Sequence, residues 1–309
     1  MSSGTQLRIW TAAVLIPAVV AAVWWGPTWL IAAAAGIVCV LSLLEFFAMG
    51  QHLGIRAYRL WTCLAALGIV AQQWYAAREA AVSRLGDALF RSGAPRVSLE
   101  LVLVLFIMGA AAIALGSRRA LAEVFTSVSV SAASLVVIVI PLSAVIRLHA
   151  VDTSGKGSAF ALNAPMDAWS APHLGRQLLL FTLVVVWVGD SAAYFAGRAI
   201  GRFKLSPELS PNKTWEGAGA NLFGALLVAV LFGRWMNIQQ VHMLAMAALA
   251  SIAGQVGDIF ESAFKRSAGV KDSGTMIPGH GGILDRIDAL ILAAPAVWYY
   301  FQWFVMRRL

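Results

Sequence analysis

Long apolar runs, separated by short polar segments, recur along most of this chain and constrain its fold more than any other feature. A run of about 20 apolar residues is long enough to cross the hydrocarbon core of a bilayer as a helix. The hydrophobic content of 60% and the mean hydropathy of +0.77 are typical of membrane helices and exclude an ordinary soluble domain. A membrane β-barrel would show short segments of alternating polarity, which the sequence does not contain. The sequence therefore predicts an all-α, polytopic integral membrane protein.

Nine membrane-spanning helices are expected from these runs. Their expected bounds are 9–25, 28–49, 60–75, 99–116, 124–148, 177–200, a run starting at 211, 241–265 and a run starting near 285. Pro141 should kink the fifth run, because proline lacks a backbone donor and clashes with the preceding turn. Polar loops are expected at 76–98, with a short amphipathic helix, and at 150–176. We expect residues 1–176 to form N-terminal helices and 177–309 a catalytic region, integrated into one membrane unit.

Charge and cysteine content add weaker constraints. The net charge of +8 at pH 7 suits contact with anionic lipid headgroups or with polyphosphates. Cys39 and Cys63 both lie inside apolar runs, so no disulfide framework is expected. The first apolar run follows Arg8 directly without a small-residue cleavage pattern, which predicts a retained helix instead of a removed signal peptide.

The segment 254–288 concentrates the charged residues of the chain. It holds nine of the 38 Lys, Arg, Asp and Glu residues and lies between two apolar runs. Near its end the sequence PGHGG at 278–282 cannot continue a helix, and its glycines let backbone amides approach an anion closely. Carboxylates, bases and glycines at a membrane edge predict a metal and phosphate site. A zinc site at His280 is disfavoured, because both cysteines are remote in sequence.

A second polar segment begins inside the sixth run, at Asp190. A carboxylate within a membrane helix must find a cation, a proton or water, and so it marks function by default. The alternative is a structural role, either an ion pair with Arg198 or a polar tie between helices. Tyr194 and Arg198 follow Asp190 on one helical stripe. Three nearby glycines should permit close helix packing: Gly189, Gly197 and Gly201.

The loop after the sixth run carries a candidate anion site. Ser210 is expected to be a helix N-cap, with Pro211 at the first helical position. Lys213 and Thr214 would then lie in the first turn, where free N–H groups favour an anion. A solvated basic loop is the alternative. In a nine-helix topology the connections after the sixth and eighth helices lie on the same side of the membrane, so this loop can meet the segment 254–288.

Three classes of function compete for these features. A transporter would place its acids in broken helices at mid-membrane and would often contain repeats, and the sequence shows neither. A packing or scaffold protein explains the apolar runs but not the mixed acidic, basic and glycine segments. An enzyme acting on a lipid phosphate and a nucleotide explains both, because carboxylates bind divalent metals and basic residues neutralise phosphates. The pattern G-x-x-x-x-G-K-[ST] does not occur, so a P-loop enzyme is disfavoured.

Two blocks of residues resemble a known enzyme family. The first comprises SAFKR at 262–266, KD at 271–272 and PGHGGILDRID at 278–288. The second comprises DSAAY at 190–194, GR at 197–198, Gly201, KL at 204–205 and SPNKTWEG at 210–217. Both are similar to the shared motifs of phosphatidate cytidylyltransferases, also called CDP-diacylglycerol synthases. The likeness extends from about residue 184 to the end, with EFF at 45–47 as a weaker one. Ala220-Asn221 departs from the glycine pair usual in that family, which affects the expected helix packing.

The resemblance implies transfer of CMP from CTP to phosphatidate, which gives CDP-diacylglycerol and pyrophosphate, with Mg²⁺ or Mn²⁺ as cofactor. The phosphate of the lipid is anionic at neutral pH, because the second ionisation of a phosphate monoester lies near about pH 6. It can attack the α-phosphorus of CTP without an obligatory general base, so the enzyme must supply alignment and charge neutralisation. Two relatives on the same scaffold are alternatives: a CTP-dependent polyprenol kinase and a cytidylyltransferase acting on an isoprenoid lipid.

The resemblance also implies roles for individual residues. Asp258 and Asp285 are expected to bind one metal together. Four basic residues are assigned to phosphates: Lys213, Lys265, Arg266 and Arg286. Substrate binding or orientation is assigned to a wider set: Asp190, Arg198, Ser210, Thr214, Glu216, Lys271, Asp272, Gly281, Gly282 and Asp288. His280 either donates to a phosphate or caps its loop, and Glu45 is either an interfacial acid or part of the site.

The expected partners are CTP, phosphatidate and membrane lipids, without nucleic acid, and a homodimer is allowed. The expected location is the bacterial inner membrane, with the active site facing the cytoplasm. With a cytoplasmic N-terminus, the inside connections carry 13 Lys and Arg residues and the outside ones 10, a small excess in the expected direction.

Overall fold

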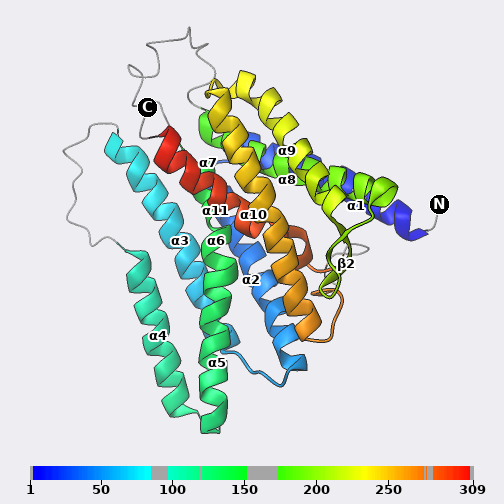
Figure 1. The fold of residues 1–309 in the computed structure, drawn as a ribbon. Helices are drawn as coiled ribbons and strands as arrows, with labels where there is room; N and C mark the ends of the chain where they lie inside the picture. The colour runs from blue at the N-terminus through cyan, green and yellow to red at the C-terminus, as the bar shows by residue number, and fades with distance from the viewer. Residues whose placement is uncertain are drawn as a thin grey trace. The chain divides into compact units, whose positions relative to one another are not determined.

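The computed structural model describes residues 3–84, 97–117, 120–151, 173–274, 276 and 281–306, and these are mostly helical (Figure 1). The longer helices are α1 (Ser3–Trp25), α2 (Thr28–His52), α3 (Arg59–Arg84), α4 (Leu99–Gly116), α5 (Leu121–Ser134), α8 (Leu174–Ile200), α9 (Trp215–Met236), α10 (Gln240–Ser267) and α11 (Leu284–Tyr300). Shorter elements are the π-helices η2 (Leu135–Val139) and η5 (Phe301–Val305), the helices α6 (Ile140–Leu142) and α7 (Ala144–His149), and the strands β1 (Lys204–Ser206) and β2 (Ser210–Thr214). The all-α prediction is confirmed.

The chain divides into two compact units, each assembled from separate stretches of sequence. The first unit comprises Met1–Ala22, Gly26–Ile146 and Phe264–Arg286. The second comprises Val23–Trp25, Arg147–Ala263 and Ile287–Leu309. Helices α10 and α11 each run through a boundary, so the end of α10 and the start of α11 belong to the first unit.

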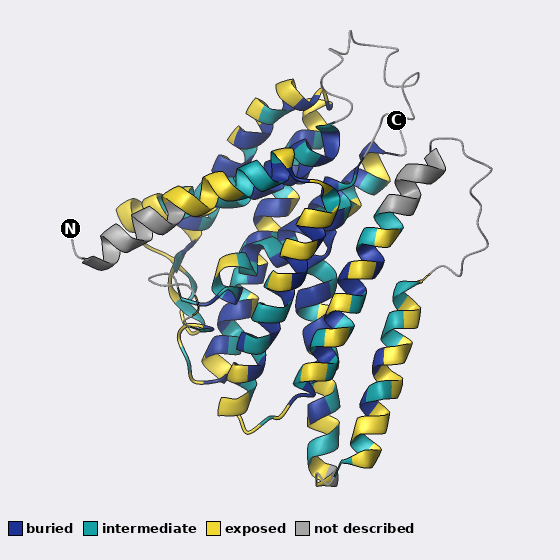
Figure 2. Cartoon of the chain, turned by 180° about the vertical axis from the view of Figure 1, so that it is seen from behind, coloured by how far each residue is buried: buried dark blue, intermediate teal, exposed yellow. Residues whose placement is uncertain are grey.

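In the first unit α2 packs along α3, and α3 packs along α4. Trp61 of α3 donates its indole N–H to the Phe106 carbonyl of α4 at 2.8 Å, and Gly109 leaves room for the indole ring. Otherwise α4 is little covered, since it buries only Phe106 and Ala110, and Figure 2 shows most of it as exposed or intermediate. Because the uncovered side chains are apolar, this helix surface suits lipid contact.

In the second unit α8 and α9 pack closely along each other. A Cβ atom on Gly189 would lie 2.7 Å from Asn221 Oδ1, and one on Gly201 would lie 2.8 Å from the Thr214 side chain. Gly197 similarly approaches Thr214 Oγ1, at 3.2 Å from its Cβ position. The close packing predicted from the three glycines is therefore confirmed. Asn221 replaces the glycine usual in the resembling family and fits because Gly189 opposite it has no side chain.

Six helices in the described part of the chain are long and apolar enough to cross a membrane. They are Thr28–His52, Leu99–Gly116, Ala122–His149, Leu174–Ile200, Trp215–Met236 and Gln240–Ser267. Ala13–Trp25 is apolar but shorter. Helices α3 and α11 lie at two of the other expected spans, but they do not meet the same criteria of length and hydropathy. The membrane class is confirmed, whereas the count of nine spans is not.

The start of α9 differs from the sequence prediction. Ser210 and Pro211 do not begin a helix, because Ser210–Thr214 forms strand β2, which pairs antiparallel with β1. The helix starts at Trp215, and Thr214 is its N-cap, with Thr214 Oγ1 accepting from Gly217 N at 3.1 Å. Threonine supplies the same kind of capping oxygen as serine, and proline is tolerated in a strand at a sheet edge. The predicted first-turn position of Lys213 is therefore wrong.

Two loop and helix predictions have mixed outcomes. The loop expected at 76–98 is wrong for residues 76–84, which continue α3, and residues 85–96 lie outside the described part. Most of the loop expected at 150–176 also lies outside it. The kink expected at Pro141 stays a prediction, but the helix is irregular around this residue: the five-residue π-helix η2 ends two positions before it, and a turn at Ser143 follows. Proline cannot donate a backbone hydrogen bond, which explains why the regular ladder is interrupted there.

Candidate active site

Lys213 and Asp258 bring the two charged segments of the sequence together. Lys213 lies on β2 and Asp258 on α10, and Lys213 Nζ is 2.5 Å from Asp258 Oδ2. Lys213 is positioned by the antiparallel pairing of β1 with β2. The residues that flank the two strands are also joined, because a carboxylate oxygen of Glu216 accepts from Arg202 N at 3.0 Å. The meeting of the two segments, predicted from membrane topology, is confirmed in this pair.

An acidic cluster surrounds Asp258. One carboxylate oxygen each from Asp258, Glu261 and Asp288 lie within 4.8 Å of one another. Glu261 is 4% exposed, and the Asp288 backbone comes close because Gly257 of α10 has no side chain. Asp190 of α8 is near enough to interact electrostatically with both Asp258 and Lys213. Four carboxylates and one ammonium therefore share this region, and three of the carboxylates, those of Asp258, Glu261 and Asp288, could hold a metal ion.

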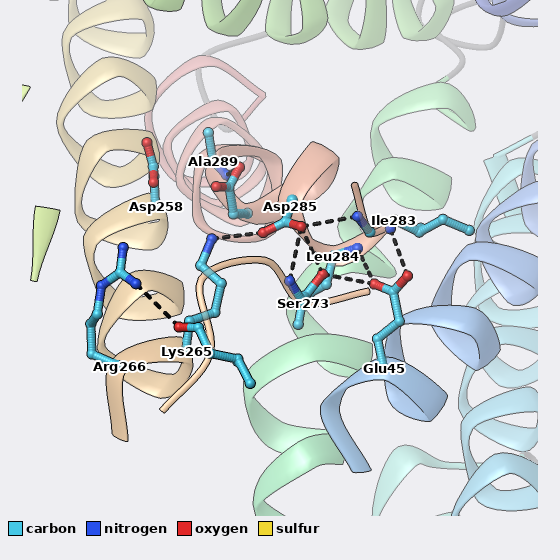
Figure 3. A network of polar contacts seen from close by, with 12 residues as sticks. Glu45, Asp258, Lys265, Arg266, Ser273, Ile283, Leu284, Asp285 and Ala289 are labelled. Carbon is cyan, nitrogen blue, oxygen red and sulfur yellow. Dashed lines mark hydrogen bonds and ion pairs between the residues drawn. The ribbon is translucent and has the colours of Figure 1, made fainter. Parts of the chain in front are cut away.

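Asp285 has a different set of partners (Figure 3). Its Oδ1 accepts from Lys265 Nζ at 2.6 Å, and its Oδ2 accepts from the backbone N–H groups of Ser273 and Gly282, both at 3.0 Å. The Ser273 hydroxyl is also 3.0 Å from Oδ2. A carboxylate with so many donors is held in one orientation at the start of α11. The assignment of Asp285 as a metal ligand stays a prediction.

Glu45 of α2 belongs to the same network. Its Oε1 accepts from Ile283 N at 2.9 Å, and its Oε2 accepts from Leu284 N and from the Ser273 hydroxyl, each at 2.9 Å. The residue is 4% exposed. The interfacial-acid interpretation of Glu45 does not fit this burial, and the structure joins Glu45 to the segment that carries Asp285.

The remaining predicted residues have varied surroundings. Asp190 Oδ1 accepts from Asn221 Nδ2 at 3.2 Å, and Arg198 donates to the Tyr194 hydroxyl at 3.0 Å, so these two charged side chains have different partners. Ser210 pairs with Ser206, and Arg266 donates to the Val270 carbonyl at 3.2 Å. Three further residues are exposed: Lys271, Asp272 and Arg286. Gly281 has a φ of 81°, a value that favours glycine, and His280 lies outside the described residues. Their assigned roles stay predictions.

A profile of the cytidylyltransferase family matches residues 6–304. The chain belongs to this family. It is 45% identical over 141 residues to the phosphatidate cytidylyltransferase of Haemophilus influenzae, a stretch covering 44% of this chain and 49% of the relative. It is 42% identical over 127 residues to that of Bacillus subtilis (40% and 47% covered), and 48% identical over 133 residues to that of Brucella suis (41% and 47% covered). The aligned stretches span about half the length of these curated relatives.

The candidate site contains polar residues that the sequence does not mark clearly. Glu261 carries a usable signal, since it follows Asp258 by three positions and so shares its helix face. Asn221 and Ser251 form an interhelical chain to Asp190, with Ser251 donating to Asn221 Oδ1 at 2.7 Å. Ser273 has no comparable signal, because its partners come from a loop and from α2.

Proposed function

We propose that this cytidylyltransferase transfers CMP from CTP to phosphatidate and releases pyrophosphate, at a divalent metal held by Asp258, Glu261 and Asp288. The observation that carries the proposal is the approach of Lys213 to Asp258 beside the acidic cluster. It supplies a phosphate-binding ammonium and metal-binding carboxylates in one place. The names of the aligned relatives support CTP and phosphatidate as the substrates.

The donor set fits a hard divalent cation. All three clustered ligand atoms are carboxylate oxygens, which Mg²⁺ and Mn²⁺ accept, and the nearby Asp190 adds further negative charge. Such a cation, when bound, neutralises and holds the triphosphate of the nucleotide. Asp285 remains a second candidate ligand through the resemblance to the family.

The residues of the chain bind and align the reactants. The Lys213 side chain is 25% exposed but its Nζ is buried beside Asp258, and we assign this ammonium to a phosphate of the nucleotide. Lys265, Arg266 and Arg286 are assigned to the remaining phosphate charge. A phosphate oxygen of phosphatidate forms the new bond to the α-phosphorus of CTP, while the bond from that phosphorus to pyrophosphate breaks. No proton needs to be removed from the nucleophile, because it is already anionic.

The reaction is proposed to take place at the cytoplasmic face of the bacterial inner membrane, where CTP is available. Phosphatidate would arrive laterally from the bilayer, and surrounding lipids would contact the apolar helix surfaces. A homodimer is included in this proposal as a state to be tested by mass measurement in detergent.

The experiment uses purified full-length protein in detergent with phosphatidate and CTP labelled at either the α- or the γ-phosphate. Label from the α-position should enter a lipid that migrates with CDP-diacylglycerol, and label from the γ-position should stay in water-soluble pyrophosphate. Transfer of the γ-label to a polyprenol would overturn the proposal in favour of a lipid kinase. Reaction with an isoprenoid lipid phosphate but not with phosphatidate would overturn the substrate assignment alone.

A further inference from the structure

Glu45 is a buried carboxylate that caps a helix far from it in sequence. Ile283 and Leu284 stand at the N-terminus of α11, and their backbone N–H groups point away from the helix towards Glu45. The first N–H groups of any helix lack partners within the helix and carry partial positive charge. Glu45 supplies both acceptor oxygens to them, from α2 and across 238 and 239 positions of sequence.

Because Glu45 is buried, its carboxylate needs these contacts to replace the hydrogen bonds that it would make with water. The residue is 4% exposed, so water cannot solvate the carboxylate well. An ionised carboxylate is tolerated inside a protein only when hydrogen bonds or opposite charge compensate its lost hydration. Two backbone amides, the Ser273 hydroxyl and the N-terminus of α11 provide that compensation.

The glycines around Glu45 fit its position. A Cβ atom on Gly274 would lie 2.6 Å from Glu45 Oε1, and one on Gly282 would lie 2.5 Å from Glu45 Oε2. The Gly282 position would in addition collide with the Ser273 hydroxyl. The loop therefore closes on the carboxylate with no space for side chains at these two positions.

Ser273 connects Glu45 to Asp285. Its hydroxyl is 2.9 Å from Glu45 Oε2 and 3.0 Å from Asp285 Oδ2, and a hydroxyl donates its one proton to one acceptor at a time. Asp285 also accepts from two backbone amides of the same loop, and it binds Lys265 with its other oxygen. Movement of the loop would thus displace the orientation of both Asp285 and Lys265.

We propose that Glu45 is a positioning residue for the reaction: by fixing Ile283, Leu284 and Ser273, it sets the orientation of Asp285 and, through it, of Lys265. This inference rests on the proposed function, which assigns metal and phosphate roles to Asp285 and Lys265. Glu45 contacts Ile283, Leu284 and Ser273, none of which is assigned to the substrate or the metal. Its effect is therefore expected in turnover more than in nucleotide binding.

The test compares Glu45→Gln, Glu45→Asp and, as a matched control, Glu100→Gln, which alters an exposed acid near the start of α4. Glutamine turns one acceptor oxygen into an NH₂ group that faces a backbone or hydroxyl donor. Because a misplacement of about 1 Å can cost about 100-fold in rate, Glu45→Gln should lower kcat at least about tenfold. The KM for CTP should stay within about threefold of the unmodified protein. Glu45→Asp keeps both oxygens and should recover part of the lost kcat, and Glu100→Gln should behave as the unmodified protein.

A second readout does not depend on activity. Hydrogen exchange of the peptide that contains Ile283 and Leu284 should be at least about tenfold faster in Glu45→Gln, intermediate in Glu45→Asp and unchanged in Glu100→Gln. All comparisons use the monodisperse fraction from size exclusion, so that misfolded protein does not contribute. Absence of CTP–phosphatidate activity in the unmodified protein would overturn the proposed function, while the exchange data would still decide whether Glu45 holds the loop. Unchanged exchange, or a kcat within about threefold of normal in Glu45→Gln, overturns the positioning role.

Discussion

Replacing Lys213 by methionine should distinguish a stabilising ion pair from a phosphate-binding residue. Methionine keeps an unbranched apolar stem and removes the ammonium. In the structure Nζ lies 2.5 Å from Asp258 Oδ2, with the side chains 25% and 34% exposed. At that distance the attraction is about 1.7 kcal/mol at the dielectric constant of water and about 7 kcal/mol at an effective value of about 20. Desolvation and side-chain ordering offset most of this, so a partly exposed pair contributes about 1 kcal/mol or less to stability.

A contact between Lys213 and a phosphate should have a larger effect on activity. A hydrogen bond to a charged group contributes about 1.5–3 kcal/mol, which corresponds to about 10–150-fold in rate. Lys213→Met should therefore lower kcat/KM for CTP by about 10–150-fold, while the free energy of unfolding changes by about 1 kcal/mol or less. Lys204→Met is the matched control, because Lys204 is an exposed lysine on the neighbouring strand of the same hairpin. It should change kcat/KM by less than about threefold.

The assay follows label from CTP into CDP-diacylglycerol by chromatography, with purified protein in detergent. Unfolding is followed in parallel by the fluorescence of the 12 tryptophans during heating. Equal and minor losses of activity in Lys213→Met and Lys204→Met would refute the phosphate role. The pair with Asp258 would then be a structural contact alone.

Three further predictions address the metal, the topology and the helix packing. Glu261→Gln should raise the Mg²⁺ concentration needed for half-maximal activity at least about tenfold. A chelator should abolish turnover of the unmodified protein, and full activity in excess chelator would contradict the metal site. For the topology, single cysteines replace the exposed residues Glu208 and Gln239 in a cysteine-free background. The first should be labelled from the cytoplasm and the second from outside, because the 22 residues of α9 span about 33 Å. Labelling of both from one face excludes α9 as a transmembrane helix. Asn221→Ala should destabilise the protein by about 1–3 kcal/mol, seen as a lower thermal midpoint, since Asp190 and Ser251 each lose a partner. Gly219→Ala on the same helix, where a Cβ atom meets nothing, should not lower the midpoint, and an equal drop in both variants removes the role of Asn221.

The apolar runs predict much of this fold because a bilayer leaves a chain few choices. Each run must satisfy its own backbone hydrogen bonds, so helices follow from length and hydropathy alone. The start of α9 could not be settled this way, because Ser210 and Thr214 are both good N-caps and only the pairing of β1 with β2 decides between them. Local sequence near Pro211 fits either structure.

The candidate site was predictable where residues share a helix or a charged segment. The sequence shows charged residues beside apolar runs at Lys213, Asp258 and Asp288. Membrane topology indicates that the segments carrying them can meet. The network of Glu45 was not predictable, because its partners Ile283 and Leu284 are backbone groups more than 200 positions away. Backbone donors have no residue identity, so no pattern in the sequence marks them.

The absence of side chains at Gly274 and Gly282 affects how variation in this loop should be interpreted. In a mutational scan, both positions should tolerate no larger residue. At Gly274 the carboxylate of Glu45 occupies the space that a Cβ atom would need, and at Gly282 that carboxylate and the Ser273 hydroxyl both do. Intolerance at glycine beside a catalytic segment is easily taken as proof that a ligand lies against the backbone. At Gly274 the same intolerance arises from an acid on another helix, and a shorter residue at position 45 should relax it. At Gly282 the Ser273 hydroxyl also occupies the space, so the intolerance there should remain. Pairwise variation of position 45 with position 274 would separate the two causes in a selection experiment.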